Sequence, residues 1–318
     1  MKPVNIQYYI LLPLILFLSS CFKDNTEFIP DQNHLINSEL LISDLVGKPA
    51  SLILDLEGKT FFPLNEKLAI EIPDSSLEDY LGNIIRGKIK VEINELTSSK
   101  KNLLSCPESV THDEILNCSK LFNIKIYHNN IPVIYQKPIS IYLKSDEVDE
   151  NVKLFILSHG EAEQNWTEAF LNNTFAYGNW KPNEGEDLIR GYKFILEQEA
   201  EWIMLGSSLG TREKKSLSLE IENTPSKFNT KNTLAFFISD DDVNVIFKMD
   251  YNPIEKKFYT DKSINNEQIK GKIVLIGQFG KEAFEFGMTN AIINADNYAK
   301  VFVKLATKEE IKAMLNAL

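Results

Sequence analysis

The stretch 88-KIKVEIN-94 decides the fold class of this chain. Ile89, Val91 and Ile93 alternate with charged or polar residues, so the apolar side chains share one face of an extended segment. A strand with one buried and one hydrated face is typical of antiparallel sheets. The sequence therefore predicts an antiparallel β-sheet around residues 88–94.

The same short period recurs through the rest of the chain. Turn clusters such as His128-Asn129-Asn130 separate the runs, and helical stretches are few. This pattern predicts a mainly β protein, built as two antiparallel β-sandwich-like domains with a short C-terminal helix. The further runs that we expect to form strands are 121–127, 133–142, 152–157, 192–196, 215–221, 234–239, 243–249, 272–277 and 299–305.

The last residues have the pattern of a helix. Thr307 and Glu310 have the spacing of a capping box, and an apolar stripe at helical spacing follows. We therefore expect a helix over 308–318 that docks on the last sheet. The expected division is a signal peptide at 1–20, a tether at 21–40, an N-terminal β-sandwich domain at 41–190 with a polar and aromatic insertion at 161–187, and a C-terminal β domain at 191–318.

The N-terminal stretch 8-YYILLPLILFLSSCFK-23 has the pattern of an export signal. Lys2 precedes an apolar run at 10–18, which is too short for a spanning helix. The ending Leu18-Ser19-Ser20-Cys21 resembles the lipobox of bacterial lipoproteins. That resemblance implies cleavage before Cys21 and acylation of its thiol and amino group; a plain secretory signal that contains a cysteine is the alternative.

Charge narrows the class of partner. Without residues 1–20 the chain carries 33 basic and 45 acidic side chains, a formal charge of −12. This balance argues against nucleic acid and against electrostatic binding to anionic lipid. The expected membrane attachment is the lipid on Cys21, with no other cofactor. Lys23-Asp24 also resembles, over two residues, the surface-export signal of Bacteroidetes-type lipoproteins.

Two cysteines remain once Cys21 is acylated. Cys106 and Cys118 lie twelve positions apart, and in an oxidising compartment a disulfide between them would stabilise the chain by roughly 3 kcal/mol. Two free thiols, or a metal site that includes His112, are the alternatives. We expect the disulfide.

The segment 72–95 carries a second resemblance. An Ile72-Pro73 turn, glycines at 82 and 87 and the strand at 88–94 are similar to a module of uncharacterised Bacteroidetes-type surface lipoproteins, distantly related to the ZU5-type β-sandwich of cytoskeletal adaptors. Later echoes extend the similarity over residues 45–318, although Glu201 and Met204 replace a Gly and an Asn of the pattern. The resemblance implies a fold and no catalytic residues.

One aromatic group is a candidate binding surface. The insertion 161–187 carries several aromatic side chains, which could stack on sugar rings or anchor a peptide or protein. The alternative is that they pack the insertion against a sheet. The candidates are Trp166, Phe170, Phe175, Tyr177 and Trp180, of which Trp166, Tyr177 and Trp180 are the main ones.

Catalytic and metal patterns are weak. His159 with Glu161 and Glu163 matches no metalloprotease spacing, and Ser158 beside His159 would point to the opposite strand face. The acidic run Asp240, Asp241 and Asp242 could offer oxygen ligands to calcium but lacks EF-hand spacing, and a hairpin turn is the interpretation that we favour.

These patterns together favour a non-enzymatic protein of the bacterial cell envelope. We expect it to be held at the outer membrane, on the periplasmic or surface face, and to act as a structural or interaction module with an envelope protein as partner. A carbohydrate- or peptide-binding surface lipoprotein is the alternative, and a hydrolase with an unrecognised site is a second alternative.

Overall fold

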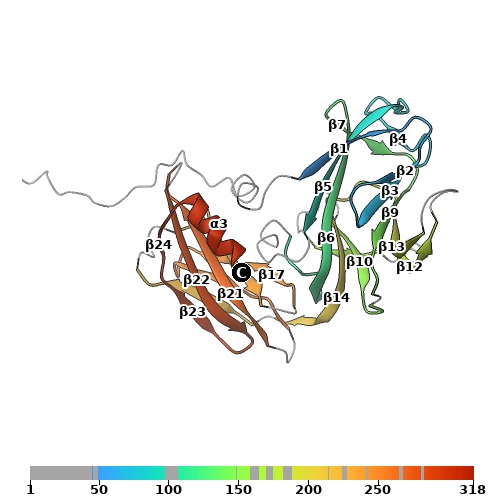
Figure 1. The fold of residues 1–318 in the computed structure, drawn as a ribbon. Helices are drawn as coiled ribbons and strands as arrows, with labels where there is room; N and C mark the ends of the chain where they lie inside the picture. The colour runs from blue at the N-terminus through green and yellow to red at the C-terminus, as the bar shows by residue number, and fades with distance from the viewer. Residues whose placement is uncertain are drawn as a thin grey trace, which may run out of the picture.

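The computed structural model describes residue 45 and residues 49–96, 107–147, 149–157, 165–169, 175–181, 188–213, 215–223, 228–240, 243–264, 268–280 and 283–318. Strands dominate these residues, and the sheets are almost entirely antiparallel. The predicted mainly β fold with one short C-terminal helix is confirmed. Figure 1 shows two β bodies joined by long strands.

The first sandwich is built from two sheets. One sheet has the order β1 (Ala50–Asp55), β5 (Lys88–Leu96), β6 (Glu114–His128), β14 (Trp202–Glu213), β10 (Lys153–Leu157) and β11 (Thr167–Glu168), with β7 (Ile131–Pro132) beside β6 and β20 (Ser263–Ile264) beside β14. The other sheet has the order β12 (Phe175–Trp180), β13 (Ile189–Leu196), β9 (Ile139–Lys144), β3 (Leu68–Glu71) and β2 (Phe61–Pro63).

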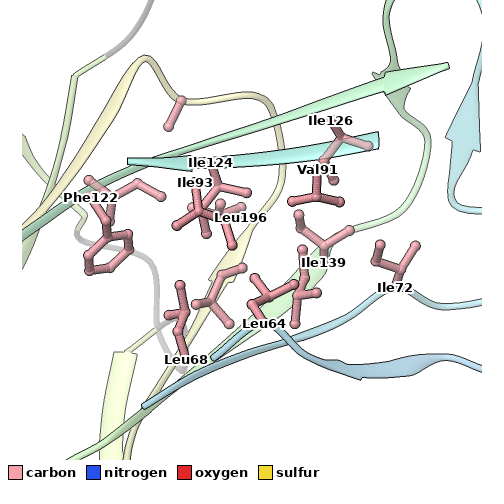
Figure 2. Close-up of a cluster of buried hydrophobic side chains, with 14 of the residues drawn as sticks. Leu64, Leu68, Ile72, Val91, Ile93, Phe122, Ile124, Ile126, Ile139 and Leu196 are labelled. Atoms are coloured by element: carbon pink, nitrogen blue, oxygen red, sulfur yellow. The ribbon is translucent and has the colours of Figure 1, made fainter. Parts of the chain in front are cut away.

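The alternating stretch at 88–94 lies at the centre of this sandwich. Ile89, Val91 and Ile93 are at most 4% exposed and pack in the core between the two sheets. Figure 2 shows Val91 and Ile93 beside Ile124 of β6, with Ile139 approaching from the opposite sheet. The apolar face therefore points inward as the period predicts, because burial of each branched side chain contributes roughly 1.5–3 kcal/mol.

The second sandwich follows the same plan. Its larger sheet has the order β17 (Ile246–Lys248), β16 (Thr233–Ser239), β21 (Ile269–Gln278), β22 (Phe284–Ile293) and β24 (Lys304–Ala306). The smaller sheet has the order β18 (Asp250–Asn252), β19 (Lys257–Thr260), β15 (Leu217–Ile221) and β23 (Tyr298–Val301). Between them, Leu219, Phe237 and Leu275 are completely buried.

A shared core joins the two sandwiches, and we call it the seam. The outer face of the first sheet supplies Leu116, Cys118 and Met204, and the larger sheet of the second sandwich supplies Phe236 and Val274. All of these side chains are at most 5% exposed. The two sandwiches therefore share one continuous hydrophobic contact.

Hydrogen bonds around Glu108 reinforce the seam. Its carboxylate accepts from the backbone N–H of Lys248 at 2.7 Å and from Nζ of Lys262 at 2.8 Å. Its carbonyl accepts from Nε1 of Trp166 at 2.8 Å. Because Lys262 is 8% exposed, this pairing supplies the counter-charge that a buried ammonium needs.

The C-terminal helix α3 (Lys308–Asn316) covers the seam beside β22 (Figure 1). Thr307 caps it: its hydroxyl accepts from the backbone N–H of Glu310, and the Glu310 carboxylate accepts from the backbone N–H of Thr307. Ile311 and Leu315 are at most 1% exposed in the seam. The capping box and the inward stripe confirm the helix, with its end at 316 instead of 318.

The two strands next to the expected division at residue 190, β13 and β14, belong to the first sandwich. β13 pairs with β9 and β12, and β14 pairs with β6 and β10. In Figure 1 the distal end of β14 runs toward the second body. The strand pairing therefore shows that the first sandwich extends to about residue 213.

Candidate functional site

A two-stranded unit closes one end of the first sandwich. β4 (Leu77–Glu78) pairs with β8 (Ile134–Tyr135), and Figure 1 shows β4 and β7 at the same end of this body. Leu77 and its partner Tyr135 face inward: Leu77 is 1% exposed, and burial raises the pKa of Tyr135. The other side of the unit faces solvent.

A turn held by one carboxylate follows β4. Asp79 accepts from the backbone N–H of Leu81 at 2.8 Å, from that of Asn83 at 2.9 Å and from the Asn83 side-chain amide at 3.0 Å. Gly82 takes a φ of 81°, which only glycine adopts without strain. The hydrogen bonds from Asn83 lower the pKa of Asp79, so the ionised carboxylate holds the turn in one conformation.

The second turn at this end joins β6 to β7. Asn129 and Asn130 have φ angles of 52° and 63°, and His128 pairs with Ile131 across the turn. Two positive φ angles in a two-residue connection match the twist of the flanking strands. β8, which pairs with β4, begins one residue after β7, so the two turns lie at the same end of the sandwich.

These turns present a group of exposed apolar side chains, which we call the apical cluster. Glu78 pairs with both Ile84 and Ile134, so these two side chains project on the same side as its carboxylate. Every member is more than 40% exposed, on a backbone fixed by strand pairing or turn hydrogen bonds. The members are Tyr80 (65%), Leu81 (69%), Ile84 (46%), Ile131 (43%) and Ile134 (48%).

A pocket lies beside the apical cluster. It has a cavity volume of about 450 Å³ and lies between the turn after β1, the connection from β3 to β4, and the residues before β5. Ile72, Leu77 and Ile85, all at most 5% exposed, form its apolar wall. Lys59 and Arg86 line it with charged groups.

Trp166, a main candidate of the aromatic insertion, is not on the surface. It is 3% exposed and belongs to the seam, where its indole N–H is satisfied by Glu108. A tryptophan in a well-packed core fills volume and cannot stack on a ligand. Trp166 therefore follows the packing alternative and not the binding one.

The remaining candidates lie on the edge strand β12. Trp180 is half-buried, and its Nε1 donates to the carbonyl of Gly191 at 3.0 Å. Tyr177 accepts from Arg190 at 3.0 Å, and Phe175 stacks on Tyr192 with a centroid distance of 5.3 Å. These contacts fix β12 to β13, as the packing alternative proposes. Phe170 lies outside the described residues.

The cysteines do not form the expected bond. Cys118 is free and 5% exposed in the seam, and burial raises the pKa of its thiol to about 12. The expected disulfide with Cys106 is therefore a wrong prediction. It came from counting cysteines, whereas the strand alternation of β6 points Cys118 into the apolar seam. Cys106 and the acylation candidate Cys21 lie outside the described residues.

Most of the weak metal and acid–base candidates lie outside the described residues. Asp240 follows β16 with its backbone N–H bonded to the carbonyl of Lys270, while Asp241 and Asp242 lie outside the described residues, as does His159. Within the described ranges, no three His, Cys, Asp or Glu side chains are grouped closely enough to hold a metal. His112 is exposed beside Asp113.

The apical cluster and the pocket were missed by sequence reasoning. Ile131 and Ile134 fall in an apolar run, 131–134, in which exposed and buried positions have the same chemistry. The available signals were Asp79-x-x-x-Asn83 around Gly82 and the Asn129-Asn130 pair, which mark two tight turns. Sequence spacing does not show that turns 45 residues apart meet.

No family model matches the chain, and no curated protein matches it. Among the described residues, no helix has both the length and the apolar character needed to cross a membrane.

Proposed function

We propose that this protein is a non-enzymatic, lipid-anchored protein of the bacterial cell envelope that binds a protein partner through the apical cluster. The observation that supports the proposal most directly is the exposure of five large apolar side chains on paired strands and a fixed turn at one end of the first sandwich. Contiguous exposed apolar surface on a folded domain commonly marks an interaction site.

The chemistry of the apical cluster favours a protein over a lipid surface. Glu78 and Asp79 lie among its apolar members, and a carboxylate is costly to bury in lipid. The mature chain has a formal charge of −12, which repels anionic lipid. Tyr80 is a residue type enriched at the centre of protein interfaces.

The anchor is the second part of the proposal. The lipobox-like Leu18-Ser19-Ser20-Cys21 supports acylation at Cys21, with the residues up to about 40 as a tether. Metabolic labelling of cells with palmitate tests it. We expect the label on the native protein and its loss in Cys21→Ala, whereas label retained in Cys21→Ala would reject the anchor.

Site-specific photocrosslinking tests the apical cluster in the native envelope. A photoreactive amino acid at Leu81 should give one defined protein adduct, because this side chain is 69% exposed on a rigid turn. A second substitution, Ile134→Asp, places a charge across from Glu78 and should abolish the adduct.

Ile254 provides the matched control. It is 91% exposed in the turn between β18 and β19 of the second sandwich, so the same probe there has at least as much access to solvent as at Leu81. The proposal fails if Leu81 and Ile254 give the same adducts, or if Ile134→Asp leaves the Leu81 adduct intact.

A further inference from the structure

The pocket beside the apical cluster has one wall made of buried apolar side chains. Ile72, Leu77 and Ile85 form a buried apolar side, and the volume of about 450 Å³ lies within the range of small-ligand sites. Gly58 and Gly87 border it with φ angles of 69° and 80°, and a Cβ at either position would meet open space.

Arg86 distinguishes this pocket from the rest of the surface. The chain has three arginines, and the other two are used internally: Arg190 donates to Tyr177, and Arg212 pairs with Asp261 at 3.6 Å. Arg86 is exposed at the pocket and forms no ion pair with a residue in the described part of the chain. Its planar guanidinium is therefore available to bind an anion through two parallel hydrogen bonds.

The lining of the pocket includes a buried hydroxyl that has no hydrogen-bond partner among the described residues. Ser76 is 1% exposed, and its hydroxyl makes no hydrogen bond to any residue that the structure describes. A buried hydroxyl without a partner destabilises the fold until a ligand or water supplies a hydrogen bond. Ser75, its neighbour, has a φ of 58°, a strained conformation that clusters at ligand sites. Ser75 and Ser76 both line the pocket.

We propose that this pocket binds a carboxylate carried on a short apolar body, either a small organic acid or the C-terminus of a peptide. Arg86 holds the carboxylate, the apolar body lies on Ile72 and Ile85, and a polar group of the ligand satisfies Ser76. Glu57 and Asp74 also line the pocket, and their negative charge favours a singly charged carboxylate over a doubly charged phosphate. This site goes beyond the proposed function and does not depend on it.

Calorimetric titration of the purified protein with N-acetyl-leucine tests the proposal. We expect binding, and at least tenfold weaker binding of N-acetyl-leucinamide, which keeps the apolar body and lacks the charge. Arg86→Gln should weaken the acid by about 10- to 100-fold, the usual effect of losing hydrogen bonds between charged groups. Lys88→Gln is the matched control, since it removes a nearby exposed positive charge that does not line the pocket.

Further probes separate the sources and the rival chemistry. A Gly-Gly-Leu peptide that binds more tightly than N-acetyl-leucine assigns the ligand to a peptide terminus, and weaker binding assigns it to a free acid. Ser76→Ala should reduce affinity severalfold without lowering the melting temperature. The proposal is overturned if acid and amide bind equally, if Arg86→Gln binds like the native protein with its melting curve unchanged, or if butyl phosphate binds more tightly than the acid.

Discussion

The thiol of Cys118 lies inside the seam, paired across the sheet with Gly206 of β14. Burial raises its pKa from the ordinary value of 9.0 to about 12, because the thiolate would have no water around it. A group whose folded pKa is raised adds stability that is complete below its unfolded pKa. That contribution is lost as the pH rises from about 9 toward 12.

Cys118→Ala therefore has a defined effect on the pH dependence of stability. The free energy of unfolding of the native protein should fall above pH 9, with Cys118 contributing at most about 1.4 kcal/mol per pH unit. The variant should lose this part of the slope. Denaturant titrations between pH 8 and pH 11 measure both curves.

The difference between the two curves isolates the thiol. Tyr135 and Tyr142 also have pKa values raised by burial, but they contribute equally to both proteins. Parallel curves above pH 9 would mean that Cys118 ionises as easily in the folded state as in the unfolded chain.

For single residues, the sequence predicts which face of a strand a side chain occupies better than it predicts the distant residues that the side chain contacts. The alternation of Ile89, Val91 and Ile93 makes their burial visible, since the period depends only on neighbouring residues. The burial of Trp166 depends on distant residues such as Glu108, which is 58 residues away in the sequence. The sequence pattern around residue 166 carries no sign of that contact. The same holds for Cys118, whose environment comes from the second sandwich.

Among the elements, α3 is one that the local sequence is sufficient to predict. Thr307 and Glu310 satisfy each other's backbone N–H groups, and Ile311 and Leu315 enter the seam. Thr307→Ala should lower the free energy of unfolding by about 1 kcal/mol, because one N–H at the helix start loses its partner. Chemical denaturation followed by circular dichroism measures the change.

Thr307→Ser is the control for α3, since it keeps a hydroxyl at the cap and should leave stability within about 0.5 kcal/mol of the native protein. Equal stability of Thr307→Ala and the native protein would show that the cap is not needed once the stripe is docked.

β22 shows an element that the sequence hides. It spans Phe284–Ile293 and pairs with β21 along its whole length, but Gly287 interrupts its alternation. The reason lies in another strand: a Cβ at Gly287 would come within 2.6 Å of Val301. A close approach set by residue 301 leaves no trace in the periodicity around residue 287.

For the whole molecule, the limits of the first sandwich follow from pairing and not from chain position. A fragment of residues 41–190 lacks almost all of β13 and the whole of β14, and β14 lies between β6 and β10 in its sheet. We expect this fragment to show no cooperative thermal transition in calorimetry, because its first sheet is split and the seam is uncovered. The chain 41–318 should melt in one transition.

A cooperative transition in the 41–190 fragment would contradict this expectation and would show that β1, β5 and β6 form a self-sufficient sheet. The seam makes the single transition of the longer chain a prediction as well, because its apolar residues come from both sandwiches.

The position of β14 also has a consequence for the order in which the protein can fold. The chain leaves the ribosome from its N-terminus, yet the central partner of β6 and β10 is supplied only by residues 202–213. Contacts between residues this far apart in sequence form slowly, since a long loop must close first. The first two hundred residues therefore cannot close the core of the first sandwich by themselves. That sandwich is completed only when the residues of the second sandwich begin to leave the ribosome.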